Sequence, residues 1–156
     1  MQAEGKGRKT TMKYKLNFEL VPDGCWKSNL RAILSPAAWK AVREAVVARA
    51  GGKCEICGAA GRLEAHERWD YDEERGVQKL TGIVALCKRC HETAHIGLAQ
   101  LRGRGAAAED WFMKVNNVSY AQMRAALGEA NEAHRRRNRV PEWALDIDYL
   151  KNFLKK

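Results

Sequence analysis

Four cysteines form two Cys-x-x-Cys pairs whose spacing is typical of a metal site. The pairs are Cys54 with Cys57 and Cys87 with Cys90. Two such pairs bring four thiolates into the tetrahedral arrangement that zinc prefers. Four protein ligands leave no open position for a substrate, so zinc bound here would be structural and would contribute to the folding free energy. Redox-active or disulfide-bonded cysteines are the alternative. It is disfavoured because no secretory signal is recognised and a reducing compartment is expected.

Three of the four histidines lie in the segment that these cysteines bound, and they predict a second metal site. His91 and His95 have i, i+4 spacing within an expected helix, so both rings project from one face. His66 lies on an expected strand and would complete a cluster of three imidazoles. Such a cluster suits zinc, nickel or manganese better than magnesium. Surface histidines that bind no metal are the alternative.

The segment that carries these residues has the pattern of two strands followed by a helix. The strands are expected at 62–67 and 77–86, with a polar connection over 70–76. The helix is expected at 88–96 and would be closed by Gly97. This order would place the strand histidine beside the helix histidines.

The flanking segments are expected to add helices and terminal strands. Apolar and polar residues alternate over 14–20, which is typical of a half-buried strand. A helix follows, with Ser35 as its N-cap and Gly51 at its end. Beyond the central segment the expected elements are a helix at 106–115, a helix at 119–137 with a capping box of Ser119 and Gln122, and a strand at 143–149. This last strand would be a partner for the first.

The strand sequence Leu63–Glu67 and the helix sequence Leu86–His95 occur in this order between the two cysteine pairs. In this respect the segment from Lys53 to Gly97 resembles the HNH, or ββα-metal, endonucleases, and in particular their zinc-containing bacterial branch. The resemblance implies hydrolysis of phosphodiester bonds with one divalent metal ion, which would be magnesium, manganese, nickel or zinc. The residues that match the family's metal ligands by position are His66, His91 and His95.

Two positions depart from the pattern of this family. Many relatives carry a second histidine directly after the strand ligand, where it acts as the general base, and this chain has Glu67 there. Many relatives also carry an asparagine shortly before the third cysteine, and this chain has Gly82 there. The second departure weakens the case for a well-oriented loop but leaves the expected fold unchanged.

Glu67 leaves two assignments open. In the favoured one, His66 binds the metal and Glu67 is the base or is replaced by another group, and an unperturbed carboxylate is a weaker base than imidazole at neutral pH. In the other, His66 is the base and Ala65 stands at the ligand position. The metal is then left with His91, His95 and a carboxylate such as Asp70 or Asp72. Because successive strand residues face opposite sides, His66 and Glu67 share a site only where the strand ends or is bulged.

Basic side chains predict a polyanionic partner. The net charge of +9 favours nucleic acid first and an anionic membrane surface second. The residues expected to contact phosphates are a cationic run at a helix end and the cations that flank the histidines, namely Arg135, Arg136, Arg137, Arg139, Lys88, Arg89, Arg102 and Arg104. No element is typical of base reading, so recognition of the backbone is expected. No apolar stretch approaches the ~18 residues of a transmembrane helix, and a cytoplasmic location is expected.

Taken together, the 156 residues predict an α+β protein with a central ββα-metal unit and a structural zinc. We expect a basic flexible arm at 1–13 and an N-terminal strand and helix at 14–52. The zinc-containing unit is expected at 53–98, and a C-terminal helical extension with a final strand at 99–156. The expected activity is that of a metal-dependent endonuclease or nickase acting on double-stranded DNA. The alternatives are a fold of this kind that binds nucleic acid without cleaving it, and a zinc-stabilised protein-interaction module. The oligomeric state is left open.

Overall fold

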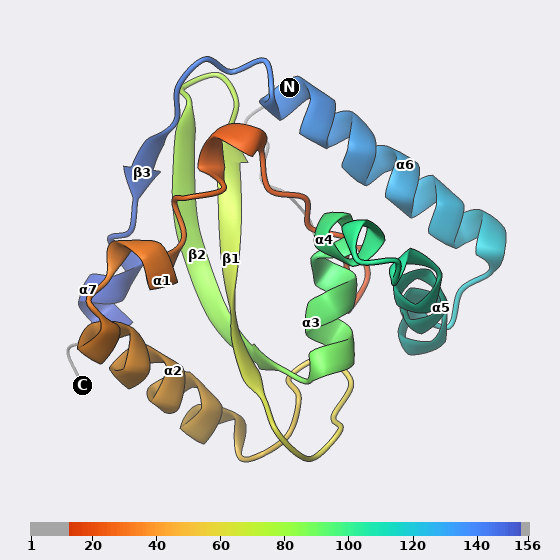
Figure 1. Ribbon diagram of the computed structural model, residues 1–156, viewed down its shortest axis with the longest axis horizontal. Helices are drawn as coiled ribbons and strands as arrows, with labels where there is room; N and C mark the ends of the chain where they lie inside the picture. Colours follow the sequence, from red (N-terminus) through yellow and green to blue (C-terminus); the bar gives the residue numbers. More distant parts are fainter. Residues whose placement is uncertain (1–12, 154–156) are drawn as a thin grey trace, which may run out of the picture.

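A long antiparallel hairpin runs through the centre of the computed structural model, which describes residues 13–153 (Figure 1). Its strands are β1 (Glu64–Asp72) and β2 (Val77–Leu86). A short strand, β3 (Ala144–Asp146), pairs in parallel with β2, so the sheet order is β1-β2-β3. β1 is therefore an edge strand of the sheet, and α3 lies along its side in Figure 1. The expected α+β class is confirmed.

The helices lie on the two sides of this hairpin (Figure 1). On one side are α1 (Leu30–Ile33) and α2 (Pro36–Ala50), with α7 (Tyr149–Phe153) beside them. The 3-10 turn η2 (Asp23–Cys25) lies at the end of α6, where the Asp23 N–H donates to Asn138 Oδ1 at 2.9 Å. On the other side are α3 (Lys88–Ala94), α4 (Ile96–Leu101), α5 (Gly105–Asn116) and α6 (Tyr120–Arg137). Helix α2 packs on β1 and β2, whereas α3 packs on β1, β2 and α5. None of the helices in this described part combines the length and apolar character needed to span a bilayer.

Apolar side chains gather into two clusters that match these two sides. The first joins Val42 and Val46 of α2 to Leu80, Ile83 and other inward residues of the hairpin. The second fills the space between α4, α5 and α6. It contains Phe18, Ile96, Ala99, Ala108, Phe112, Met123 and Leu127. The cysteine pairs belong to the first cluster: Cys54 and Cys90 are buried in it, and Cys57 and Cys87 pack against it.

Local sequence signals account well for the long helices. Ser35 Oγ accepts a hydrogen bond from the Ala38 N–H at the start of α2, and Gly51 ends this helix with a φ of 67°. Such a left-handed conformation is the usual role of glycine behind a helix. The capping box of Ser119 and Gln122 is present at the start of α6, as predicted. The bounds of β2 also agree with the sequence prediction.

The expected terminal strands are wrong in their pairing. Residues 13–20 form no strand, although Leu16 and Phe18 are buried as the alternation requires. This N-terminal segment lies against α3 and α5 instead: the Glu19 N–H donates to Ala94 O at 2.8 Å. β3 is only part of the strand expected at 143–149, and its partner is β2 rather than the first segment.

Two further boundaries differ from the expectation. β1 continues to Asp72, because the polar residues 70–72 pair with β2 and only residues 73–76 remain as the connection. The helix after Cys87 does not close at Gly97. It ends at Ala94, and Gly97 lies within the next helix, α4, where a Cβ would be 3.2 Å from Leu20 Cδ2. This glycine therefore serves the close approach of the N-terminal segment rather than a helix end.

A bulge interrupts the hairpin at one place. Arg68 pairs with Gly82 but Trp69 pairs with Leu80, so Thr81 is an extra residue on β2. Such a residue changes which side chains of the bulged strand face inward. Leu80 and Ile83 both become buried core residues, although an odd number of steps separates them.

The arm expected at 1–13 lies outside the described residues except for Lys13.

The side chain of Asn116 holds the N-terminal segment in place. It accepts a hydrogen bond from the Leu16 N–H at 3.1 Å and donates one to Leu16 O at 2.8 Å. We expect Asn116→Ala to lower the free energy of unfolding by about 1–3 kcal/mol, because two backbone groups beside the buried Leu16 lose their partner. Urea unfolding measures this. Lys114→Ala, an exposed site on the same helix, is the control and should stay within ~0.5 kcal/mol of the wild type. Equal stability of both variants would contradict the assignment.

Candidate metal centres

Four cysteines converge at one end of the hairpin. The Sγ atoms of Cys54, Cys57, Cys87 and Cys90 all lie within 4.8 Å of one another, and none forms a disulfide. The first pair lies before β1 and the second pair spans the junction of β2 and α3. Four sulfur atoms at such separations fit a tetrahedral metal site of the kind that zinc occupies. The sequence prediction that these residues share one site is confirmed.

The local backbone prepares the sulfur atoms for a cation. Cys87 is the N-cap of α3, and its Sγ accepts from the Cys90 N–H at 3.5 Å. Cys54 Sγ accepts from the Ile56 N–H at 3.4 Å and the Cys57 N–H at 3.5 Å. Such N–H donors stabilise a thiolate, which is the form that binds metal.

The pKa values of the cluster follow from burial and from these donors. Burial alone would raise the pKa of the Cys54 thiol, but the backbone N–H groups around it lower that pKa to about 7. Burial raises the pKa of Cys90, and likewise that of Cys87, whose sulfur also lies 3.7 Å from Cys57 Sγ. Without a cation, these neighbouring thiols therefore resist full ionisation. A divalent ion would supply the missing positive charge, so the donor set fits the implied zinc.

Three histidines form a second cluster on the face of β1 that meets α3. One ligand atom from each of His66, His91 and His95 can be chosen so that all three lie within 4.8 Å of one another. The ring centroids are 4.8–5.2 Å apart, as expected for three imidazoles around one point. His66 is almost completely buried, with an exposed fraction of 2%. The expected grouping of His66 with His91 and His95 is confirmed, although His95 lies at the junction of α3 and α4 rather than within the expected helix.

Two glutamates bind the histidines from outside the cluster. Glu19 Oε1 lies 2.9 Å from His66 Nε2, and Glu64 Oε1 lies 2.7 Å from His91 Nδ1. A carboxylate in this position accepts the ring N–H, fixes the tautomer and leaves the other nitrogen with a free lone pair. The nitrogens left for a metal are then His66 Nδ1 and His91 Nε2. His66 Nδ1 is buried and has no hydrogen-bond partner among the described residues.

Electrostatics keep the helix histidines neutral. Burial, together with the neighbouring rings of His66 and His91, lowers the pKa of His95 to about 3, although the charge of Glu19 opposes this. Burial also lowers the pKa of His91, although its bond to Glu64 opposes this. Burial would raise the pKa of Glu19, but the His66 ring overcomes this effect and lowers it. The neutral imidazoles of His91 and His95, together with the unpartnered buried Nδ1 of His66, fit a divalent metal ion at this place.

Glu67 lies apart from the three histidines. Its Oε2 accepts a hydrogen bond of 3.2 Å from the Leu30 N–H at the start of α1, and burial raises the pKa of its carboxyl. His66 and Glu67 share a site only if the strand is irregular between them, but the pairing there is regular and the bulge lies after Arg68. The favoured assignment, with Glu67 as the base beside His66, does not agree with this placement.

The other assignment also lacks its extra ligand. Asp72 Oδ1 accepts from the N–H groups of Glu74 and Arg75 at the hairpin tip, so it caps the turn. Ala65 packs against the first apolar cluster, on the other side of the sheet from His66. Asp70 does not belong to the histidine cluster. The structure thus brings together His66 with both helix histidines, as the first assignment requires for the metal.

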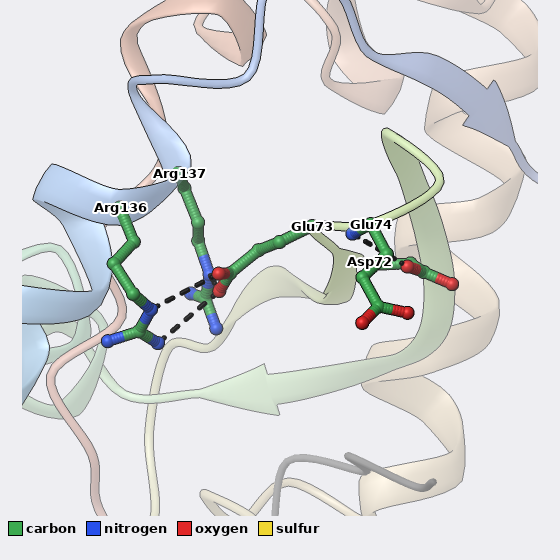
Figure 2. A network of polar contacts seen from close by, with 5 residues as sticks. All are labelled: Asp72, Glu73, Glu74, Arg136 and Arg137. Atoms are coloured by element: carbon green, nitrogen blue, oxygen red, sulfur yellow. Dashed lines mark hydrogen bonds and ion pairs between the residues drawn. The ribbon is translucent and has the colours of Figure 1, made fainter. Parts of the chain in front are cut away.

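The predicted phosphate contacts divide into two groups. Two arginines at the end of α6 form ion pairs with Glu73 at the hairpin tip (Figure 2). Arg136 Nε lies 3.1 Å from Glu73 Oε1, and Arg137 Nε lies 3.3 Å from Glu73 Oε2. Arg135 pairs with Glu132 on its own helix, and Arg139 lines a shallow depression beside this tip. At about 3.3 Å per strand residue, Glu73 is roughly 20 Å from His66. This group therefore lies away from both clusters.

The second group stays close to α3. Arg104 forms two hydrogen bonds with Glu92 of α3, at 2.9 and 3.1 Å. The Arg89 guanidinium lies 4.7 Å from the centre of the Trp111 ring, and the Trp111 Nε1–H donates to Cys90 Sγ at 3.4 Å. Lys88 and Arg102 are exposed. These cations surround the helix that carries two of the histidines.

The sequence prediction missed both glutamates that contact the histidines. Glu64 precedes His66 by two residues on the same strand, so it lies on the same face, and this spacing was a usable signal. Glu19 comes from a distant segment whose approach depends on packing, and no local pattern marks it.

Comparison with models of protein families, with curated proteins and with solved structures found no match for this chain. The chemistry of the two clusters therefore rests on their own residues.

Removal of one cysteine should release the metal that joins the two pairs. We expect Cys87→Ser to lose zinc and to lower the melting temperature by more than 10 °C, since structural zinc supplies folding free energy of roughly 10 kcal/mol or more. Zinc content by elemental analysis and thermal unfolding measure this. Cys25 is buried but far from the cluster in sequence and contacts, so Cys25→Ala is the control and should keep its zinc. A wild-type protein that is as stable after zinc removal as before it would refute the site.

The buried histidines should make stability depend on pH when no second metal is bound. In the unfolded chain, His95 titrates near its ordinary pKa of about 6.5, whereas in the fold its pKa is about 3. The unfolded state then binds more protons between these values, so stability falls as the pH is lowered through this window. We expect His95→Gln to reduce the slope between pH 7 and 5, measured by urea unfolding. If the free energy of unfolding of wild type and His95→Gln had the same pH dependence, His95 would not be a buried neutral ring.

Proposed function

We propose that the protein is a metal-dependent endonuclease or nickase of the HNH type, which hydrolyses phosphodiester bonds in DNA. The observation that carries this proposal is the meeting at a single point of His66 from β1, His91 from α3 and His95 from the end of α3. This arrangement occurs on a hairpin followed by a helix, with four metal-binding cysteines at the hairpin's base. It agrees with the resemblance that residues 53–97 have to this family.

The chain's own residues would divide the work as follows. His66, His91 and His95 would hold one divalent ion. When bound, it supplies Lewis-acid stabilisation of the negative charge that develops on the phosphate oxygens. Glu19 and Glu64 orient the rings of His66 and His91 through the hydrogen bonds of 2.9 and 2.7 Å. Three neutral ligands from the protein leave coordination positions for substrate and water. The cysteine cluster would hold a structural zinc and take no part in the reaction.

A second candidate is a protein that binds nucleic acid through this fold without cleaving it. One observation favours it: the residue expected as the general base, Glu67, is bonded to the backbone of α1. A site that holds a metal but lacks an activated water would retain affinity for phosphate and lose hydrolysis.

Plasmid cleavage tests the proposal and separates the two candidates. Purified protein is incubated with supercoiled DNA and magnesium, manganese, nickel or zinc, and nicked and linear products are measured. We expect metal-dependent cleavage that falls at least about 100-fold in His95→Ala, because losing even an outer partner of a metal ligand typically costs 10–100-fold. His134→Ala is the matched control, since this ring lies outside the cluster and faces Asp23.

Each outcome has a distinct meaning for the two candidates. Cleavage by wild type and His134→Ala but not by His95→Ala supports the nuclease. DNA binding without cleavage under any metal, by a folded protein that contains zinc, supports the second candidate. Equal cleavage by all three proteins would remove the histidine cluster from the reaction.

A further inference from the structure

We infer that Arg68 is the residue that binds the substrate's phosphate beside the histidine cluster. This inference rests on the proposed function, because it assigns a phosphodiester to the same site. Arg68 would form no covalent bond. It would hold the non-bridging oxygens and stabilise the negative charge that increases during hydrolysis.

The position of Arg68 on β1 directs it to the face of the histidine cluster. Strand pairing is regular from Glu64 to Arg68, and the bulge follows directly after Arg68. Side chains two residues apart on a regular strand lie on the same face. Arg68 is therefore the next side chain after His66 on that face.

The guanidinium of Arg68 has one buried donor without an acceptor. Its Nε is buried and lacks a hydrogen-bond partner among residues 13–153, and no ion pair to Arg68 is found there. An unpaired buried donor of a charged group costs free energy, so a partner is expected. Glu19 does not fill this role: its Oε1 is bonded to His66, and its Oε2 also has no hydrogen bond.

Two arginines near α3 already have partners. Arg104 is bound to Glu92 of α3, and Arg89 lies over the Trp111 ring. The cations at the end of α6 lie at the hairpin tip, where Arg136 and Arg137 bind Glu73 (Figure 2). Arg68 thus differs from these other arginines in having no acidic or aromatic partner in direct contact within the described chain.

The residue opposite Arg68 leaves its stem uncovered. The cross-strand partner is Gly82, and a Cβ placed there would be 4.0 Å from Arg68 Cβ. Directly opposite side chains in a sheet normally contact each other. A glycine provides no such contact, so the arginine side chain can extend towards a ligand without competition from its neighbour.

Charge and shape both select a phosphodiester as the ligand. Three neutral imidazoles do not reduce the positive charge of a bound divalent ion, and Arg68 adds one further positive charge. The planar guanidinium donates two parallel hydrogen bonds to a pair of phosphate oxygens, which a point charge such as lysine does not reproduce. A monoanionic diester that binds the metal with one oxygen would thus present another to Arg68.

Titration of inorganic phosphate into the zinc-loaded full chain tests this inference by calorimetry, without requiring cleavage. We expect Arg68→Gln to lower phosphate affinity about 10–100-fold, which corresponds to the loss of charge-assisted hydrogen bonds. Arg43→Gln, on α2 at the other side of the hairpin, is the control and should bind phosphate as the wild type does. Zinc content and thermal unfolding are measured for each protein. Arg68→Met keeps an apolar stem of similar length and replaces the glutamine variant if that variant does not fold.

The outcomes separate this inference from the proposed nuclease. Weaker phosphate binding by either Arg68 variant, at unchanged zinc content, supports the inference even if the wild type cleaves no DNA. Unchanged phosphate binding in a folded, zinc-loaded Arg68 variant overturns it, even if the wild type is an active nuclease. A wild type that does not bind phosphate at all also overturns it. For an active enzyme, Arg68→Gln should raise KM and lower kcat for plasmid, with Arg43→Gln unchanged.

Discussion

The four-cysteine cluster is the constraint on which the rest of the site depends. Its sulfur atoms come from the loop before β1 and from the first turn of α3, so a metal bound there would tie the start of the strand to the start of the helix. His66 and the two helix histidines follow these anchor points by only a few residues. A small rotation of α3 about its first turn would move His95 away from His66. With a metal bound, the cysteines would therefore determine distances in a cluster that they do not touch.

The carboxylates around the histidines reduce the free-energy cost of burying the rings. A ring nitrogen that donates to Glu19 or Glu64 is satisfied, and the remaining nitrogen points to the shared centre. Glu19 belongs to the N-terminal segment, which Asn116 and the stacking of Phe18 on Phe112 hold against α5. The site is thus completed by a part of the chain outside the central hairpin and helix. Its integrity depends on packing in the second apolar cluster.

Local patterns in the sequence predicted the elements that local energetics decide. Ser35, Gly51 and the capping box at Ser119 define helix ends through contacts within a few residues, and these predictions are confirmed. The cysteine and histidine groupings were predicted because their spacing has a chemical meaning in itself. The pairing of β3, the loss of the first strand and the role of Glu19 depend on contacts between distant segments, which no spacing encodes. Glu67 was misplaced for a related reason: only the backbone pairing decides where a strand is irregular.

The extra residue at Thr81 divides the hairpin into two halves, and the length of one half can change without altering the side-chain alternation of the other. The half between the bulge and the cysteines holds His66 and Arg68 in strict alternation, so a one-residue shift there would exchange the two faces. The half beyond the bulge ends in the turn of Gly76 and the contacts of Glu73 with α6, far from any metal ligand. Related chains should then vary in hairpin length at the tip while keeping the number of residues between the bulge and the cysteines. In such a pattern, the tip of the hairpin changes together with the helix that it contacts. The part near the cysteines is constrained by the residues of the two clusters.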